Sequence, residues 1–236
     1  MKVAKYHACG NDFIIVRERE VDQPVSFAKQ ICHRHLGIGA DGLILVDENP
    51  LKMTVYNQDG SKAEMCGNGL RCFVHYCYDE GIISGSICNV HSEAGVYECR
   101  RISVEPFVVR VNMKQISLKP YQNTMVVGVP HKVFLKNELI LDEGLLANIS
   151  KKENTNVDWI EVLTPRAIRV VTYERGVGVS KACGSGCCAS AAYVYRNGYC
   201  ENQIDCILDY GMIQIMIEDE NIIMQGPSVK VMEGSV

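Results

Sequence analysis

The sequence contains no long hydrophobic run, no excess of basic residues and no recognisable secretory signal. Its apolar stretches stay far below the roughly 20 residues that a membrane-spanning helix needs. The 24 basic side chains are outnumbered by 28 acidic ones, so the chain offers no positive field for a nucleic acid. The first residues, MKVAKYHACGNDFIIV, lack the unbroken apolar segment of a signal peptide. We therefore expect a cytoplasmic protein whose partners include neither a membrane nor a nucleic acid.

Cysteine pairs of the CxxC type are also missing, although the chain has 12 cysteines. Structural zinc sites usually take their ligands from two such close pairs. Cys32, His33 and His35 crowd together, but no second pair accompanies them, so we expect no metal site. In a reducing compartment most thiols stay free, and a thiol among apolar residues packs as a small hydrophobe. That description fits Cys72, Cys77, Cys88, Cys99, Cys200 and Cys206.

An internal duplication is the strongest organisational signal. The segments EMCGNGLRCFVHYCYDEG and KACGSGCCASAAYVYRNG each carry one CGxG, with Cys66 and Cys183 lying 117 positions apart. The same spacing relates Asp41 to Asp158, and the strands GNDFIIV and GVPHKVFL match at a spacing of 118. We predict two similar halves, residues 1–117 with Cys66 and residues 118–226 with Cys183. A last strand at about 227–236 is expected to return to the first half.

The residues around each CGxG predict a strand, a tight turn and a helix. A β-branched run precedes the motif, apolar residues at helical spacing follow it, and a glycine closes the helix. Cys66 and Cys183 are therefore expected at helix N-termini, where free N–H groups favour an anion and stabilise a thiolate. Two such thiols from equivalent halves suggest a base and an acid on opposite faces of one carbon centre, as inversion requires.

Seven blocks, in order along nearly the whole chain, resemble the signature of the diaminopimelate epimerase family. They are GNDF (10–13), GADG (39–42), YNQDGS (56–61), MCGNGLRC (65–72), NVDW (156–159), YERG (173–176) and ACGSG (182–186). The resemblance implies an isomerase that inverts an amino-acid α-carbon with two cysteines and without pyridoxal phosphate or another cofactor. It also implies an α/β (α+β) fold of two similar domains, each a wrap of strands around a central helix, with the active site in the cleft between them.

The resemblance also assigns roles by motif. Cys66 and Cys183 become the acid/base pair, while His131 and Glu174 modulate thiol protonation. The Arg175 guanidinium suits a distal carboxylate because its donors match that group in a fork. Substrate-binding residues are Asn11, Asn57, Gly67, Asn68, Asn156, Glu174, Arg175, Gly184 and Ser185. The implied reaction is LL- to meso-diaminopimelate in lysine and cell-wall precursor synthesis, and the implied partner is a small amino acid, with a homodimer left open.

Two departures from the family pattern leave the substrate open. The family usually has an asparagine where this chain has Val129 and a glutamine where it has Gly42, so a racemase of another polar amino acid, such as histidine, is the alternative. A cysteine hydrolase and a non-catalytic amino-acid-binding protein are further alternatives. Simpler roles also exist for individual residues: Asn11 and Asn57 are typical of turns, and Glu174 and Arg175 could form a solvated pair.

Overall fold

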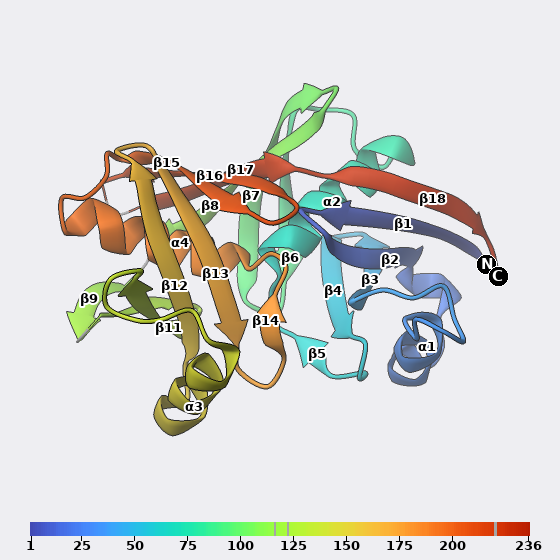
Figure 1. Ribbon diagram of the computed structural model, residues 1–236. Helices are drawn as coiled ribbons and strands as arrows, with labels where there is room; N and C mark the ends of the chain where they lie inside the picture. The colour runs from blue at the N-terminus through green and yellow to red at the C-terminus, as the bar shows by residue number, and fades with distance from the viewer. Residues whose placement is uncertain (116, 122, 220) are drawn as a thin grey trace. The chain divides into compact units, whose positions relative to one another are not determined.

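The computed structural model describes residues 1–115, 117–121, 123–219 and 221–236. The chain divides into two compact units, each treated below by itself (Figure 1). The first unit combines Met1–Val111 with Gly226–Val236, and the second spans Asn112–Gln225. None of the helices in the described ranges is long and apolar enough to cross a membrane.

The first unit begins and ends in neighbouring strands. β1 and β18 pair antiparallel with Lys2 opposite Ser235, and the amino group of Met1 donates to the carbonyl of Val236 (Figure 1). The elements of this unit are β1 (Lys2–Ala8), β2 (Asn11–Arg17), η1 (Glu18–Glu20), α1 (Pro24–Ile31), β3 (Gly42–Glu48), β4 (Leu51–Asn57), β5 (Lys62–Ala63), α2 (Gly67–Asp79), β6 (Ile87–Ser92), β7 (Gly95–Val104), β8 (Phe107–Gln115, which runs past the unit's end) and β18 (Val229–Ser235).

The second unit repeats this order of elements. They are β9 (Ser117–Tyr121), β10 (Thr124–Val127), β11 (Val129–Leu135), α3 (Glu143–Glu153), β12 (Asn156–Thr164), β13 (Ala167–Glu174), β14 (Gly178–Ser180), α4 (Gly184–Arg196), β15 (Gln203–Leu208), β16 (Gly211–Glu218) and β17 (Asn221–Pro227, which also crosses the boundary). Since β11 pairs parallel with β12 across α3, as β2 does with β3 across α1, the two units share one connection pattern.

Each unit has one helix enclosed by its strands. In α2 the buried residues include Leu70, Phe73 and Cys77, which lie three to four positions apart, but burial continues on the other faces as well. In α4 the buried positions are mostly small, with Ala189 and Ala192 among those that have no exposed surface. A helix that is buried nearly all round must be wrapped by other elements. The predicted α/β fold, two similar domains with strands around a central helix, is confirmed.

Strand pairing shows one detail in which the two units differ. Phe13 pairs with Gly42 in the first unit, and Phe134 pairs with Trp159 in the second. Gly42 and Trp159 are 117 positions apart, whereas Phe13 and Phe134 are 121 apart. β2 and β11 themselves begin 118 positions apart, at Asn11 and Val129, as predicted, so the difference lies in their register against the next parallel strand. The paired positions of the first two parallel strands are therefore closer in sequence in the second unit, with Phe134 opposite Trp159, than in the first, with Phe13 opposite Gly42.

Candidate active site

Cys66 caps the N-terminus of α2, as its place before two glycines predicts. Its backbone is extended, with φ −142° and ψ 114°, and its sulfur accepts a hydrogen bond from the Gly69 N–H at 3.4 Å. That contact uses one of the donors that every helix N-terminus leaves without an intrahelical partner. A Cβ on residue 69 would lie 3.3 Å from the Cys66 Cβ and from Ile44, so glycine allows the thiol to sit this close.

Two asparagines and a buried arginine surround the Cys66 thiol. The Asn68 side chain donates to the Asn11 side-chain oxygen at 3.1 Å, and this oxygen lies 3.9 Å from the Cys66 sulfur. Arg71, which has no exposed surface, donates to the Asn68 side-chain oxygen at 2.8 Å. Its guanidinium therefore turns the Asn68 amide so that the N–H₂ group faces Asn11. Arg71 was not among the predicted site residues.

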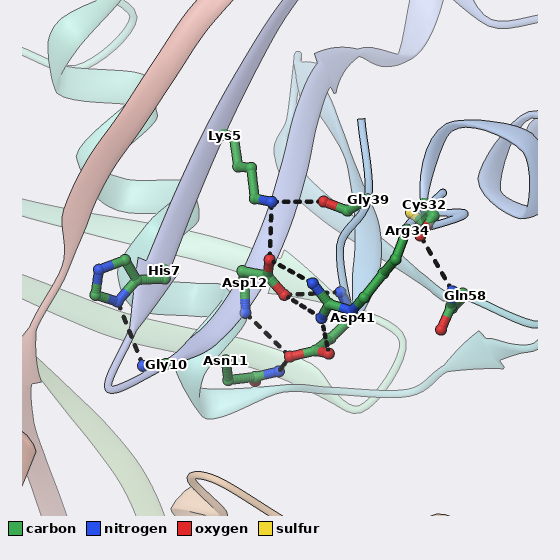
Figure 2. Close-up of polar contacts among 10 residues, drawn as sticks. All are labelled: Lys5, His7, Gly10, Asn11, Asp12, Cys32, Arg34, Gly39, Asp41 and Gln58. Carbon is green, nitrogen blue, oxygen red and sulfur yellow. Dashed lines mark hydrogen bonds and ion pairs between the residues drawn. The ribbon is translucent and has the colours of Figure 1, made fainter. Parts of the chain in front are cut away.

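Asn11 is fixed from its other side by an ionic cluster (Figure 2). The Asn11 amide donates to Asp41 at 2.8 Å, and Arg34 bridges Asp41 and Asp12 at 2.5 and 2.8 Å. Lys5 lies 2.9 Å from the Asp12 carboxylate. Burial alone would raise the pKa of Asp12, but hydrogen bonds from Arg34 and Lys5 lower it to about 2. Asp12 thus stays ionised at neutral pH, and the cluster holds the Asn11 amide toward Asp41, which leaves the Asn11 oxygen toward Cys66.

Asn57 and Gly42 pair with each other across β3 and β4. The Asn57 side chain is exposed and donates to Ser61 at 2.9 Å, which is the turn-shaping role that asparagine often has. A Cβ on Gly42 would lie 2.8 Å from the Tyr56 carbonyl and 3.3 Å from the Phe13 ring. Packing therefore explains why glycine stands at position 42.

Cys183 caps α4 in the same way as Cys66 caps α2. Its sulfur accepts from the Gly186 N–H at 3.3 Å and lies 3.3 Å from the Ser185 hydroxyl. Burial and the negative charges of Glu174 and Asp158 raise the pKa of the Cys183 thiol well above its usual value, although the bonds from Ser185 and Gly186 work in the opposite direction. Cys183 is therefore a protonated thiol near neutral pH.

A buried hydrogen-bond chain extends from this thiol within the second unit. The Ser185 hydroxyl lies 3.0 Å from His131 Nε2, and His131 Nδ1 lies 2.9 Å from Asp158. Thr172 donates to the other Asp158 oxygen at 2.6 Å. His131 and Asp158 have no exposed surface. Asp158 was not predicted as a site residue, but the repeat gave a signal for it, since it matches Asp41, which holds Asn11 near Cys66.

The remaining predicted residues of the second unit lie partly beside His131 and partly at the exposed surface. The Asn156 side-chain amide donates toward His131 Nε2 at 3.3 Å, and its side-chain oxygen accepts from the backbone N–H of Arg175 at 2.9 Å. The Arg175 guanidinium reaches the Asn154 side chain at 2.7 Å on the exposed surface. Glu174 ends β13, and its charge is one of the causes that raise the pKa of Cys183. Gly67 and Gly184 are the first residues of α2 and α4.

Substitution of Gly186 by alanine is expected to destabilise the second unit. The added Cβ would lie 2.3 Å from the Thr172 hydroxyl and 2.7 Å from an Asp158 oxygen, so the start of α4 must shift. Overpacking of this kind costs about 1 to 3 kcal/mol. Urea unfolding should show a lower midpoint for Gly186→Ala, a smaller decrease for Gly69→Ala, and no comparable change for Gly85→Ala, whose new Cβ would have only an ordinary contact of 3.7 Å. Equal midpoints for the three variants would contradict this packing argument.

Comparison with known proteins identifies close relatives over the whole chain. The family model described as Diaminopimelate epimerase matches residues 3–118 and 125–235. A diaminopimelate epimerase of Alkaliphilus metalliredigens is 34% identical over 99% of this chain and 96% of its own length. One from Methanocaldococcus jannaschii is 30% identical over 100% of this chain and 98% of its own length.

Solved structures share the fold at much lower identity. A predicted epimerase from Pseudomonas aeruginosa superimposes with a TM-score of 0.76 at 10% identity, covering 100% of this chain and 98% of its own. A hydroxyproline epimerase from Agrobacterium vitis, solved with trans-4-hydroxy-L-proline, gives a TM-score of 0.67 at 12% identity, with 99% and 91% coverage. At these identities the likeness concerns the fold alone.

Proposed function

The chain belongs to the diaminopimelate epimerase family and is an isomerase, and on this premise we propose that it converts LL-diaminopimelate to the meso form by proton transfer between two cysteines. This reaction supplies meso-diaminopimelate for lysine and cell-wall precursor synthesis. The observation that carries the proposal is the twin arrangement of the thiols. In both units a cysteine caps the helix that the strands enclose, and its sulfur accepts from the glycine N–H three residues later.

In the proposed mechanism, one cysteine thiolate removes the α-proton of the substrate and the other cysteine thiol delivers a proton to the opposite face. The C–H bond to the first face breaks as an S–H bond forms, and the second S–H bond breaks as the new C–H bond forms. The raised pKa of Cys183 favours its thiol form, so Cys183 is the acid in the resting enzyme and Cys66 is the base. In the reverse reaction the two thiols exchange these roles.

The helix ends supply the electrostatic part of the mechanism. Removal of an α-proton places negative charge on the substrate carboxylate, and the N–H groups at the start of α2 and α4 are suited to stabilise it. Gly67 and Asn68, with Gly184 and Ser185, provide these positions in the proposal. The Glu174 carboxylate accepts a hydrogen bond from the substrate ammonium group. Its charge also disfavours the Cys183 thiolate, so a bound ammonium would make proton removal by Cys183 easier.

The distal end of the substrate would lie against polar side chains of both units. Asn11, Asn57, Asn156 and Arg175 are its candidate contacts. Val129, in the position where the family pattern has asparagine, is 42% exposed at the start of β11 and has no side-chain donor. The Arg175 guanidinium, held on the surface by Asn154, has the planar donor set that recognises a carboxylate in a fork. This assigns the second carboxylate of diaminopimelate to Arg175.

A substrate panel tests the proposal directly. LL-diaminopimelate, L-histidine, L-lysine and L-glutamate are incubated separately with the protein under reducing conditions, and the products are resolved by chiral chromatography. We expect LL-diaminopimelate alone to approach an equilibrium mixture with the meso form. The Cys66→Ser/Cys183→Ser double variant is the control. Faster inversion of L-histidine would overturn the assigned substrate, and absence of inversion for every compound would overturn the proposed reaction.

A further inference from the structure

A second pair of thiols lies in the first unit, away from the helix caps. Cys88 on β6 is directly opposite Cys99 on β7 in an antiparallel hairpin. Directly opposed residues point to the same face of a sheet, with Cα atoms about 4.5 to 5.5 Å apart. This spacing falls inside the roughly 4.4 to 6.8 Å range that a disulfide spans without backbone movement. Both cysteines are free thiols in the structure.

The two thiols differ in accessibility and in environment. Cys88 is half-buried, whereas Cys99 has no exposed surface. The Cys99 thiol donates to the Cys88 sulfur, and this hydrogen bond lowers the pKa of Cys88 although burial opposes it. The same bond and burial raise the pKa of Cys99. The Tyr97 carbonyl, 3.8 Å from the Cys99 sulfur, is a second acceptor for the same thiol.

We propose that Cys88 and Cys99 form a redox-active dithiol site, which low-molecular-weight disulfides of the glutathione type oxidise to an intramolecular disulfide. Reactive redox cysteines combine accessibility, thiolate character and a nearby resolving thiol, and this hairpin supplies all three. The site is separate from the caps of α2 and α4, and it does not depend on the proposed epimerase reaction.

Oxidation proceeds in two exchange steps. The Cys88 thiolate attacks one sulfur of the small disulfide, so a mixed disulfide forms and one small thiolate leaves. The Cys99 thiolate then attacks the Cys88 sulfur, forming the protein disulfide and releasing the second small thiolate. The two protons from the protein thiols are taken up by the two leaving thiolates. Overall, two cysteine thiols are oxidised and one small disulfide is reduced to two thiols.

Cys77 of α2 is the competing partner. The charge of Cys88 acts on Cys77, so the two thiols lie in one region of the first unit, but Cys77 has no exposed surface. Burial raises the pKa of Cys77 far above its usual range. The hydrogen bond to Cys88 and burial likewise raise the pKa of Cys99, so geometry decides between the two thiols. Cys99 lies directly opposite Cys88 in the hairpin, at a spacing that a disulfide spans, whereas Cys77 lies on α2, so Cys99 is the resolving thiol.

Peptide mapping of the full chain tests the proposal. The reduced protein is equilibrated with glutathione and glutathione disulfide at increasing ratios, free thiols are blocked with N-ethylmaleimide, and the protein is cut with trypsin and a glutamate-specific protease. Glu93 and Glu98 lie between Cys88 and Cys99, so the two cysteines end on separate peptides unless a disulfide joins them. We expect the joined peptides to become the major form while Cys77 remains blocked by the maleimide.

Two variants separate the steps. Cys99→Ser removes the resolving thiol and should trap glutathione on Cys88, whereas Cys77→Ser should leave the joined peptides unchanged. Because both replacements conserve side-chain size, near-native circular dichroism is the check on folding. Three outcomes would overturn the proposal: a Cys77–Cys88 linkage, a mixed disulfide on Cys88 that persists with Cys99 present, or maleimide labelling of both cysteines at every ratio.

Discussion

Replacing either Cys66 or Cys183 by serine is expected to lower kcat for epimerisation by at least about 10³-fold, with little change in stability. Proton transfer by a positioned group contributes about 10² to 10⁴ to a rate, and a serine hydroxyl is far too weak an acid to take the place of a thiol. The substitution keeps the cap geometry, because a serine oxygen also accepts from a helix N-terminal N–H, here that of Gly69 or Gly186. Cys200→Ser is the matched control, since this buried thiol lies beside the Thr164 carbonyl and has no assigned role.

Solvent deuterium gives a second measurement on the same variants. Turnover in D₂O should place deuterium on the α-carbon, because the acid delivers a proton that has exchanged with solvent. Each single variant keeps one of the two cysteines, so we expect the two variants to exchange the α-hydrogen of opposite stereoisomers. The double variant should exchange neither. Exchange without either thiol, or a single variant that epimerises at the parent rate, would contradict the two-cysteine mechanism.

The helix caps could be predicted from sequence because each depends on a few adjacent residues. A cysteine followed by two glycines, then by apolar residues at helical spacing, determines where a helix begins and which side chain caps it. The duplication strengthened this prediction, since Cys66 and Cys183 have the same neighbours. The structure gives both sulfurs the same hydrogen bond, from Gly69 and from Gly186.

The side chains that support each thiol could not be predicted in the same way. Arg71 is only five residues from Cys66, but nothing in its spacing shows that the guanidinium is buried and directed at Asn68. Asp158 contacts His131 across two neighbouring parallel strands. In these strands His131 pairs with Asn156, which lies 25 residues later in the chain. Such contacts depend on strand register, which the sequence pattern left uncertain. The ionic cluster around Asn11 has the same origin.

The two supporting networks also differ in chemistry, and no motif comparison predicts this difference. Beside Cys66 the contact is an asparagine oxygen, fixed by Asp41 and the ionic cluster with Arg34. Beside Cys183 the contact is a serine hydroxyl, which leads to a histidine and a buried carboxylate. An asparagine cannot take up or release a proton at working pH, whereas a hydroxyl–imidazole chain can reorganise its protons. The chemical asymmetry fits the different resting states proposed for the two thiols.

Asp158→Asn is therefore expected to reduce kcat by about 10²-fold while it makes Cys183 more reactive toward alkylation. Asp158 acts on the thiol through its charge and orients His131 through a 2.9 Å hydrogen bond. Removal of the negative charge stabilises the Cys183 thiolate, so the pKa of Cys183 should fall and its alkylation should begin at a lower pH. The misdirected His131 ring no longer supports the Ser185 hydroxyl, so turnover decreases although the thiolate is more abundant.

The alkylation profile separates this positioning role from a general loss of structure. Iodoacetamide labelling of Cys183 is followed by tandem mass spectrometry between about pH 6 and pH 10, a range that brackets an ordinary thiol pKa. Thr172→Val is the matched control, because it removes the 2.6 Å hydrogen bond to Asp158 but keeps the carboxylate charge. We expect a downward shift of the profile for Asp158→Asn and none for Thr172→Val. If both variants lose activity with unchanged profiles, Asp158 serves only to stabilise the fold, because a charge that acts on Cys183 must change the pH at which this thiol ionises.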